Sequence, residues 1–254
     1  MKLFFRKTGS GEPLIIMHGL FGTSDNWNTL AKKYGEHFTT YTVDMRNHGQ
    51  SSHSNEWNYD VMAEDIAELM DDEKISSSHI MGHSMGGKVA MFMAGKFPER
   101  INKLIVSDIA PKYYAPHHRE LLDALQGLDL NTTTTRKEAE AYMESIIPEP
   151  GVRQFLLKSL YWKAEKLAWR FNLEVISNEI NNVGEELSRN VFFEGPTLFV
   201  RGSESHYITD NDIDQILEHF PFSKLATIQG AGHWIHAEKP MEYLKETLEF
   251  LLGN

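Results

Sequence analysis

The chain has 254 residues, of which 41% are apolar and 24% are charged. That length and composition indicate a globular protein with a sizeable core and exclude collagen-like, low-complexity and largely disordered classes. The 36 acidic residues outnumber the 25 Lys and Arg, and a formal net charge of -11 argues against nucleic-acid partners and anionic membranes. The sequence contains no Cys, which excludes disulfides and thiolate nucleophiles and fits a reducing compartment.

The first residues lack the pattern of a secretory signal. Only residues 3–5 form an apolar run before Arg6 and Lys7, whereas a signal needs about 7 to 15 apolar residues in succession. No later stretch approaches the roughly 20 apolar residues that span a bilayer. We therefore expect a soluble, unprocessed, cytoplasmic protein.

Short apolar runs alternate with helical patterns along the first third of the chain. The apolar runs, which predict strands, cover residues 3–6, 14–17, 39–43, 79–81 and 104–107. Helical patterns lie at residues 27–34 and 61–70, and a further helix follows the glycine-rich turn near residue 84. This alternation is typical of strand-helix units in a mostly parallel sheet.

The pattern changes between residues 111 and 194, where helical patterns follow one another without a strong strand run. They cover residues 119–125, 137–146, 152–162 and 164–175. Alternation then resumes, with strands predicted at 197–200 and 225–228 and helices at 213–219 and 241–252. The sequence thus predicts one α/β domain over residues 1–254, with a core of 1–110 and 195–254 and an all-helical cap insertion at 111–194.

Residues 82–86 read Gly-His-Ser-Met-Gly and match the pattern G-x-S-x-G. A buried strand precedes the pattern and a helix follows it, which is the context that a nucleophile elbow requires. The flanking glycines allow a sharp turn that lifts the hydroxyl of Ser84 above the sheet, and the helix N-terminus favours developing negative charge. Ser84 is therefore the candidate nucleophile.

Four separated segments together resemble the serine α/β-hydrolases over essentially the whole chain. They read HGLFG at 18–22, DMRNHGQS at 44–51, GHSMGG at 82–87 and GAGH at 230–233. The resemblance implies an α/β-hydrolase fold, with a mostly parallel eight-stranded sheet flanked by helices and a helical cap. It implies a serine esterase that needs no cofactor and no metal.

A serine hydroxyl needs a general base, and His233 is the candidate because its loop follows the last predicted strand. His18 and His83 lie inside motifs, yet their places beside the glycine turns favour structural hydrogen bonding.

The acid that orients the base is less evident. Many α/β-hydrolases carry it after the penultimate strand, where residues 201–207 of this chain contain no Asp. Asp108 ends the strand after the nucleophile strand, and residues 106–111 resemble a bacterial esterase subgroup with the acid at this place. We favour Asp108, with Glu204, Asp210 and Asp212 as alternatives.

Acyl transfer also requires two donors for the oxyanion. One is the N–H of Met85, directly after the nucleophile. By resemblance the other comes from Leu20, with Phe21 as the neighbouring possibility. Phe21, Tyr207 and Trp234 flank the candidate catalytic positions in the sequence and are candidate substrate-binding residues.

Two further groups of residues have a structural and a functional interpretation. Asp44 and Arg46 are expected to brace loops near the site rather than to touch substrate. The insertion contributes aromatic and methionine side chains of which most should be core and some could line an apolar cleft: Tyr113, Tyr114, Met143, Phe155, Tyr161, Trp162 and Trp169.

These features predict a serine carboxylesterase that hydrolyses short-to-medium acyl esters, and acyl-CoA thioesters as a further class, through an acyl-enzyme on Ser84. Thioesterase, perhydrolase, C–C hydrolase and acyl transferase chemistry would use the same residues. Dehalogenases and epoxide hydrolases need a carboxylate at position 84. A non-catalytic binding module is the alternative from a different class, and it usually lacks the nucleophile or the base.

Overall fold

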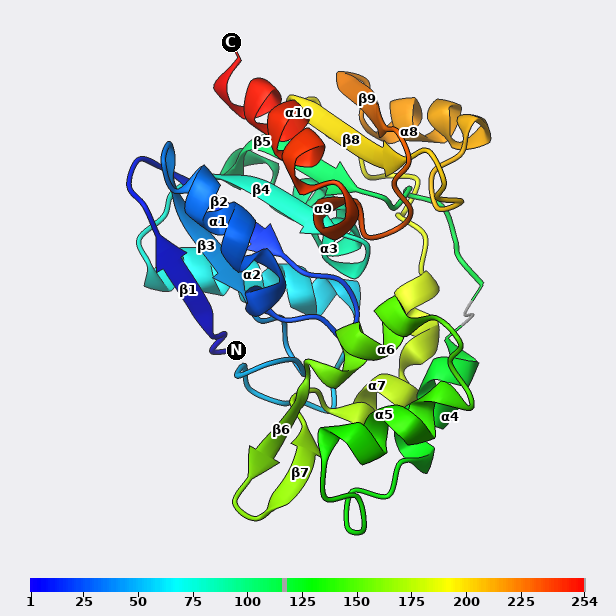
Figure 1. Ribbon diagram of the computed structural model, residues 1–254. Helices are drawn as coiled ribbons and strands as arrows, with labels where there is room; N and C mark the ends of the chain where they lie inside the picture. Colours follow the sequence, from blue (N-terminus) through cyan, green and yellow to red (C-terminus); the bar gives the residue numbers. More distant parts are fainter. Residues whose placement is uncertain (116–117, 254) are drawn as a thin grey trace.

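A seven-stranded sheet forms the centre of the computed structural model, which describes residues 1–115 and 118–253 (Figure 1). The strand order is β1-β3-β2-β4-β5-β8-β9. Only β1 runs antiparallel to its neighbour, and all other neighbours are parallel. The strands are β1 (Phe5–Thr8), β2 (Glu12–Met17), β3 (Phe38–Val43), β4 (Ser78–His83), β5 (Ile101–Ser107), β8 (Thr197–Gly202) and β9 (Ser223–Ile228).

Both faces of the sheet are covered because its central strands are apolar on both sides. Successive side chains of a strand point to opposite faces, so Leu14 and Ile16 of β2 share one apolar cluster and Ile15 and Met17 share another. The first cluster includes α1 (Asn28–Tyr34) and α10 (Pro240–Leu252), and the second includes α2 (Tyr59–Asp72) and α3 (Met85–Lys96). The short helices α8 (Ile213–His219) and α9 (Ile235–Glu238) flank the last strand. Single 3₁₀ turns are η1 (Ser24–Trp27), η2 (Pro98–Arg100), η3 (Ile180–Gly184) and η4 (Asp210–Asp212).

The expectation of an eight-stranded sheet is wrong for the described residues, which form seven strands in the sheet. Residues 1–4 do not add an edge strand beside β1. The carbonyl of Phe4 instead accepts from the N–H of Asp44, and the N–H of Phe4 donates to the Ser51 hydroxyl. The first of these bonds continues the pairing of β1 with β3 beyond Phe5 and Val43, so Phe4 lies in line with β1 and not beside it.

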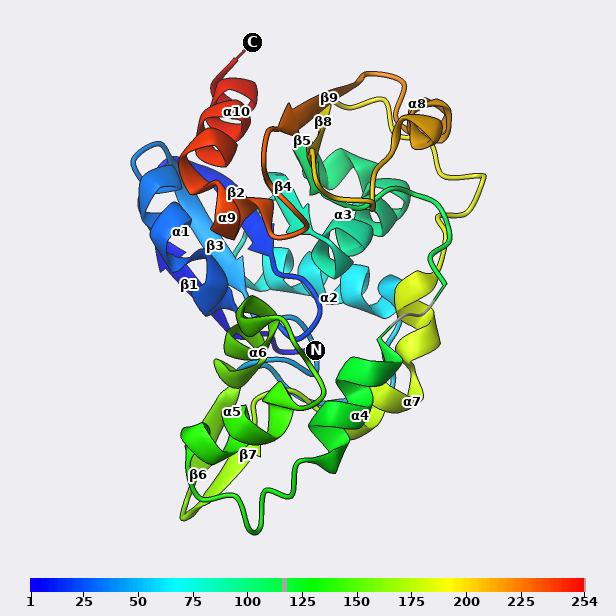
Figure 2. The same cartoon turned by 45° about the vertical axis from the view of Figure 1, so that its right-hand side comes forward.

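Residues 111–194 lie between β5 and β8 in the sequence and form a separate group of elements off one edge of the sheet (Figures 1 and 2). We call this stretch the inserted segment. It contains α4 (Arg119–Gly127), α5 (Arg136–Glu144), α6 (Pro150–Leu157), β6 (Leu160–Lys163), β7 (Lys166–Trp169) and α7 (Leu173–Asn178).

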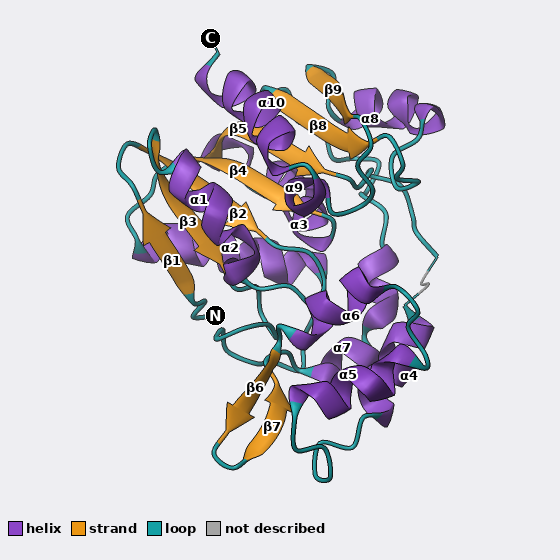
Figure 3. Cartoon of the chain, viewed as in Figure 1, coloured by secondary structure: helices purple, strands orange, loops and turns teal. Residues whose placement is uncertain are grey.

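The prediction that the inserted segment is all-helical is wrong, because β6 and β7 form an antiparallel hairpin (Figure 3). Short apolar patterns are ambiguous between helix and strand, and aromatic residues such as Tyr161 and Trp162 favour strands. The pairing aligns Leu160 with Trp169 and Trp162 with Leu167, so that these four side chains share one face. Leu160 and Leu167 are buried there, while Trp162 stays exposed near the turn.

A buried lysine joins the inserted segment to the sheet core. Lys88 of α3 is fully buried, and its ammonium group donates to the carbonyls of Pro111, Lys112 and Glu185, at 3.3, 2.7 and 2.5 Å. The first two carbonyls lie at the start of the inserted segment and the third lies near its end. One side chain therefore binds both ends of the inserted segment, where the chain leaves the sheet core and where it returns. No helix of the described residues is long and apolar enough to cross a membrane.

Candidate active site

Ser84 occupies the turn between β4 and α3. Its φ of 52° lies in the left-handed region, which is costly for a residue with a side chain and persists only where the surroundings enforce it. The N–H of Ser84 donates to the carbonyl of Ser107 at 2.9 Å, which ties the turn to β5. The predicted nucleophile therefore stands at the start of α3 on a strained elbow.

The glycines of the motif are required by close backbone approaches. A Cβ on Gly82 would lie 2.0 Å from the carbonyl oxygen of Gly86, and a Cβ on Gly86 would lie 2.5 Å from the carbonyl oxygen of Met17. Neither contact could be relieved by moving a flexible side chain. The sequence therefore folds here as a sharp strand-to-helix turn because the two flanking positions carry no side chains.

The loop after β9 brings His233 to Asp108, which directly follows β5. Nδ1 of His233 lies 2.8 Å from Oδ2 of Asp108. Since a carboxylate only accepts, Nδ1 carries the proton and Nε2 is the acceptor that could receive one. Asp108 itself has a φ of 52°, and its N–H donates to the carbonyl of Val200 at 2.8 Å. This bond to β8 fixes the carboxylate at the edge of the sheet.

The carboxylate of Asp108 is fully buried and carries three contacts. Besides His233, the hydroxyl of Ser205 donates to Oδ2, and the N–H of Gly202 lies 3.4 Å from Oδ1. Burial raises the pKa of Asp108 to about 7, while the hydrogen bonds from Ser205 and Gly202 oppose that rise. Ser205 was missed by the sequence analysis, since no motif marks a serine at this place.

The alternative acids lie elsewhere. Glu204 is exposed, and no bond between its carboxylate and His233 occurs in the described part of the chain. Asp210 pairs with Arg201 at 2.7 Å, and Asp212 pairs with Lys112 at 2.7 Å. Among the four candidate acids, Asp108 is the one that the described structure brings to His233.

The imidazole of His233 is also held by packing. The ring of Tyr207 stacks on it with centroids 3.9 Å apart and planes 17° apart. The carbonyl of His233 accepts from Nε2 of His83 at 2.8 Å. Burial lowers the pKa of His83 to about 3, so this ring is neutral at pH 7 and acts as a structural donor.

Two backbone N–H groups are available beside Ser84. Met85 opens α3, where the first N–H groups of a helix have no intrahelical acceptor. In the described residues the N–H of Leu20 donates to no protein acceptor either, whereas the N–H of Phe21 donates to Nε2 of His48 at 3.2 Å. The geometry therefore favours Leu20 over Phe21 as the second oxyanion donor.

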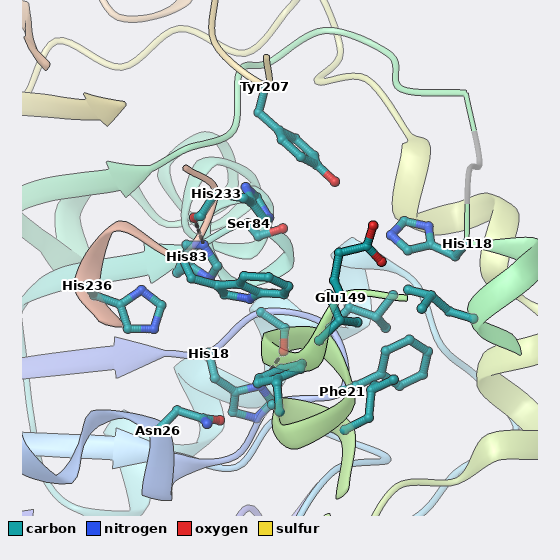
Figure 4. Close-up of a pocket in the computed structure, with 18 of the residues that line it drawn as sticks. His18, Phe21, Asn26, His83, Ser84, His118, Glu149, Tyr207, His233 and His236 are labelled. Atoms are coloured by element: carbon teal, nitrogen blue, oxygen red, sulfur yellow. Dashed lines mark hydrogen bonds between the residues drawn. The ribbon is translucent and has the colours of Figure 1, made fainter. Parts of the chain in front are cut away.

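A cavity of about 270 Å³ opens at Ser84 and His233 (Figure 4). The three predicted substrate-binding residues Phe21, Tyr207 and Trp234 line it. The sequence analysis missed its other walls, of which most come from the inserted segment: Asn26, His118, Leu121, Ile147, Glu149, Val152 and Leu156. Of the seven aromatic and methionine candidates of the inserted segment, Phe155 lines this cavity, while Tyr113 and Trp162 are exposed.

Asp44 contacts loops, Arg46 contacts α2 and the loop before it, and neither lines the cavity. The carboxylate of Asp44 accepts from the N–H groups of Ser24 and Gln50, at 2.6 and 2.8 Å. Arg46 makes a two-bond ion pair with the buried Asp65. These contacts brace the turn that follows β3, as the sequence suggested.

Comparison with known proteins agrees with this geometry. The family described as alpha/beta hydrolase fold matches residues 12–240. An sn-1-specific diacylglycerol lipase of Danio rerio is 37% identical over 97% of this chain and 80% of its own length. Esterase YbfF of Escherichia coli is 37% identical over 95% of this chain and 94% of its own. A solved structure titled marine microorganism esterase has a TM-score of 0.96 and 43% identity, covering 98% of this chain and 99% of that one.

The chain therefore belongs to the α/β-hydrolase fold family. Within that family it is an esterase-type serine hydrolase, a class to which the resemblance in the four motifs already pointed.

Proposed function

We propose that this protein is a serine carboxylesterase that cleaves short-to-medium-chain acyl esters through an acyl-enzyme on Ser84. The observation that carries the proposal is the 2.8 Å contact between His233 and the buried Asp108, made at a cavity that Ser84 also lines. A nucleophile, an oriented base and an acid are the parts that acyl transfer from a neutral hydroxyl requires.

In the proposed reaction His233 takes the proton of Ser84 as the hydroxyl oxygen attacks the ester carbonyl. Asp108 holds Nδ1–H of the imidazole and stabilises the imidazolium that forms. The N–H groups of Leu20 and Met85 donate to the oxyanion. His233 then gives its proton to the leaving alcohol, and water attacks the acyl-enzyme by the same route to release the carboxylic acid.

The cavity supports the proposed substrate class. Its volume of about 270 Å³ lies just below the range of about 300–1,000 Å³ that ligand pockets span, which suits a small substrate. Apolar side chains such as Leu121, Ile147 and Phe155 form much of its wall and suit an acyl chain. We propose that residues 111–194 act as a cap that covers this chain, and that Phe21, Tyr207 and Trp234 contact the substrate.

The same proposal includes two further substrate classes. One is diacylglycerol, which appears in the name of the lipase relative, and the other is acyl-CoA thioesters. A cytoplasmic location is also proposed, supported by the cysteine-free composition.

The first test is the intact mass of the protein after incubation with a fluorophosphonate, run beside hydrolysis of p-nitrophenyl butyrate. We expect one adduct and turnover in the parent protein, and neither in Ser84→Ala. A second panel compares acyl chains of two to twelve carbons, diacylglycerol and acyl-CoA. Absence of both adduct and turnover on every substrate would refute the esterase and support a binding module.

A further inference from the structure

The peptide groups of Phe21 are held from two sides, by the sheet core and by the inserted segment. On the core side its N–H donates to Nε2 of His48 at 3.2 Å. On the other side its carbonyl accepts from the hydroxyl of Ser159 at 3.1 Å. Ser159 lies in the link between α6 and β6, so one residue of the glycine-rich loop after β2 bridges core and insertion.

The core side of this bridge is rigid. Nδ1 of His48 lies 2.9 Å from the carbonyl of Arg46, and a carbonyl only accepts, so Nδ1 carries the proton and Nε2 accepts from Phe21. Burial lowers the pKa of His48 to about 3, which keeps the ring neutral and preserves this tautomer at pH 7.

The inserted side is equally constrained. Ser159 is buried, its N–H donates to the carbonyl of Leu156 at 3.0 Å, and its carbonyl accepts from Arg170 at 2.8 Å. The ring of Phe21 packs on Phe171 with centroids 5.0 Å apart. The hydroxyl of Ser159 is therefore presented from a fixed backbone.

The two bonds at Phe21 bear on the oxyanion hole because of the residue that precedes Phe21 in the chain. Leu20 directly precedes Phe21, and its N–H is the proposed oxyanion donor. Phe21 has a φ of 61°, an uncommon conformation for a bulky residue that needs outside contacts to persist. We expect release of either bond to let the backbone at Phe21 relax toward a commoner φ and to shift the Gly19–Leu20 peptide, which carries the preceding N–H, with it.

We propose that Ser159 is a positioning residue of the oxyanion hole. From the inserted segment it holds the carbonyl of Phe21, while His48 holds the N–H of the same residue from the core. The inserted segment then has a second role besides covering the acyl chain, because its contact with Phe21 sets the direction of the Leu20 N–H. This inference rests on the proposed acyl-enzyme mechanism.

The test compares Ser159→Ala with the parent protein on p-nitrophenyl butyrate. Deleting an oxyanion donor costs on the order of 10² to 10³ in kcat, and misdirecting it should cost part of that. We expect kcat to fall about tenfold while KM changes less than twofold. Ser159→Thr keeps the hydroxyl and should retain most of the rate.

A transition-state analogue gives a second readout that a merely structural role would not move. A butyl trifluoromethyl ketone forms an oxyanion on the serine, whereas the corresponding secondary alcohol binds without one. In Ser159→Ala the inhibition constant of the ketone should rise by the same factor by which kcat/KM falls, and that of the alcohol should stay constant.

The matched control is Ser78→Ala. Ser78 is also buried and donates its hydroxyl to a carbonyl, that of Pro13 at 3.0 Å, but it lies at the start of β4, far along the strand from Ser84. It should lose comparable thermal stability and keep its kcat. If Ser159→Ala does not fold, Ser159→Cys keeps the size with a weaker donor and takes its place.

Two results would overturn the inference. An unchanged kcat in Ser159→Ala would show that the bond is structural, and a raised KM at constant kcat in that variant would place Ser159 in substrate binding. Either result leaves the parent turnover and its loss in Ser84→Ala intact, so it is distinct from a failure of the proposed esterase function.

Discussion

Replacing Asp108 with Asn removes the charge behind His233 while preserving the volume of the side chain. In the structure Nδ1–H of His233 donates to the buried carboxylate at 2.8 Å. An amide at this place can turn its NH₂ group toward Nδ1, which selects the tautomer protonated at Nε2 and leaves no acceptor for the proton of Ser84. We expect kcat on p-nitrophenyl butyrate to fall on the order of 10⁴-fold.

The same substitution should not cost stability at pH 8. Burial raises the pKa of Asp108 from 3.8 to about 7. The folded protein therefore holds this proton more tightly than the unfolded chain, and the free energy of unfolding falls as the pH rises from about 4 to about 7. That difference in pKa corresponds to at most about 4 kcal/mol, and a neutral amide does not incur it.

Two quantities are measured for each variant. They are kcat for hydrolysis of p-nitrophenyl butyrate and the free energy of unfolding from urea titrations at pH 5 and pH 8. Asp108→Asn should be at least as stable as the parent at pH 8, and its stability should depend less on pH between 4 and 7. Glu204→Gln is the matched control, because Glu204 is exposed in the loop after β8, and it should change neither quantity. A fall in kcat below tenfold, or a larger effect in Glu204→Gln, would refute the assignment of the acid.

Three further predictions concern the pH dependence of the rate, Lys88 and Glu149. First, kcat/KM should fall about tenfold per pH unit below pH 7, because burial raises the pKa of Asp108 to about 7 and its protonated form cannot stabilise the imidazolium; a flat profile between pH 5 and 7 would contradict this. Second, Lys88→Met removes the ammonium donor from the carbonyls of Lys112 and Glu185, while that of Pro111 keeps the N–H of Leu187, and it should lower the free energy of unfolding by about 2–4 kcal/mol in urea titrations. A loss below about 0.5 kcal/mol would mean that the two ends of the inserted segment are held without Lys88. Third, Glu149 places a carboxylate on the cavity wall, so mono-p-nitrophenyl glutarate should be a poorer substrate than p-nitrophenyl butyrate, and Glu149→Gln should narrow that gap about three- to tenfold in kcat/KM; an unchanged ratio would place the carboxylate out of reach of the acyl chain.

Much of the core could be predicted from the sequence because its signals are local. The seven apolar runs correspond to the seven strands of the sheet, since each run alternates or is continuous over the length of a strand. The elbow at Ser84 is equally local, because Gly82 and Gly86 leave room for backbone atoms within a few residues or on the adjacent strand. The hairpin of β6 and β7 was missed because Leu160 and Leu167 are buried by pairing across a turn, and apolar residues at that spacing also fit a helix.

The sequence by itself determined the nucleophile candidate, the base candidate and the class of hydrolase, because motifs of four to eight residues carry them. It left four acids possible and two donors for the second place in the oxyanion hole. The order of the strands brings one of the four acids to the candidate base, since β5 pairs with β8 and thereby sets Asp108 beside Ser205 and His233.

Tertiary contacts distinguish the two candidate donors, because the N–H of Phe21 donates to His48, 27 residues further along the chain. The cavity walls and the bond from Ser159 likewise join residues more than a hundred positions apart. Such contacts depend on how separate elements pack, and packing between distant segments leaves no pattern in the residues of either one alone.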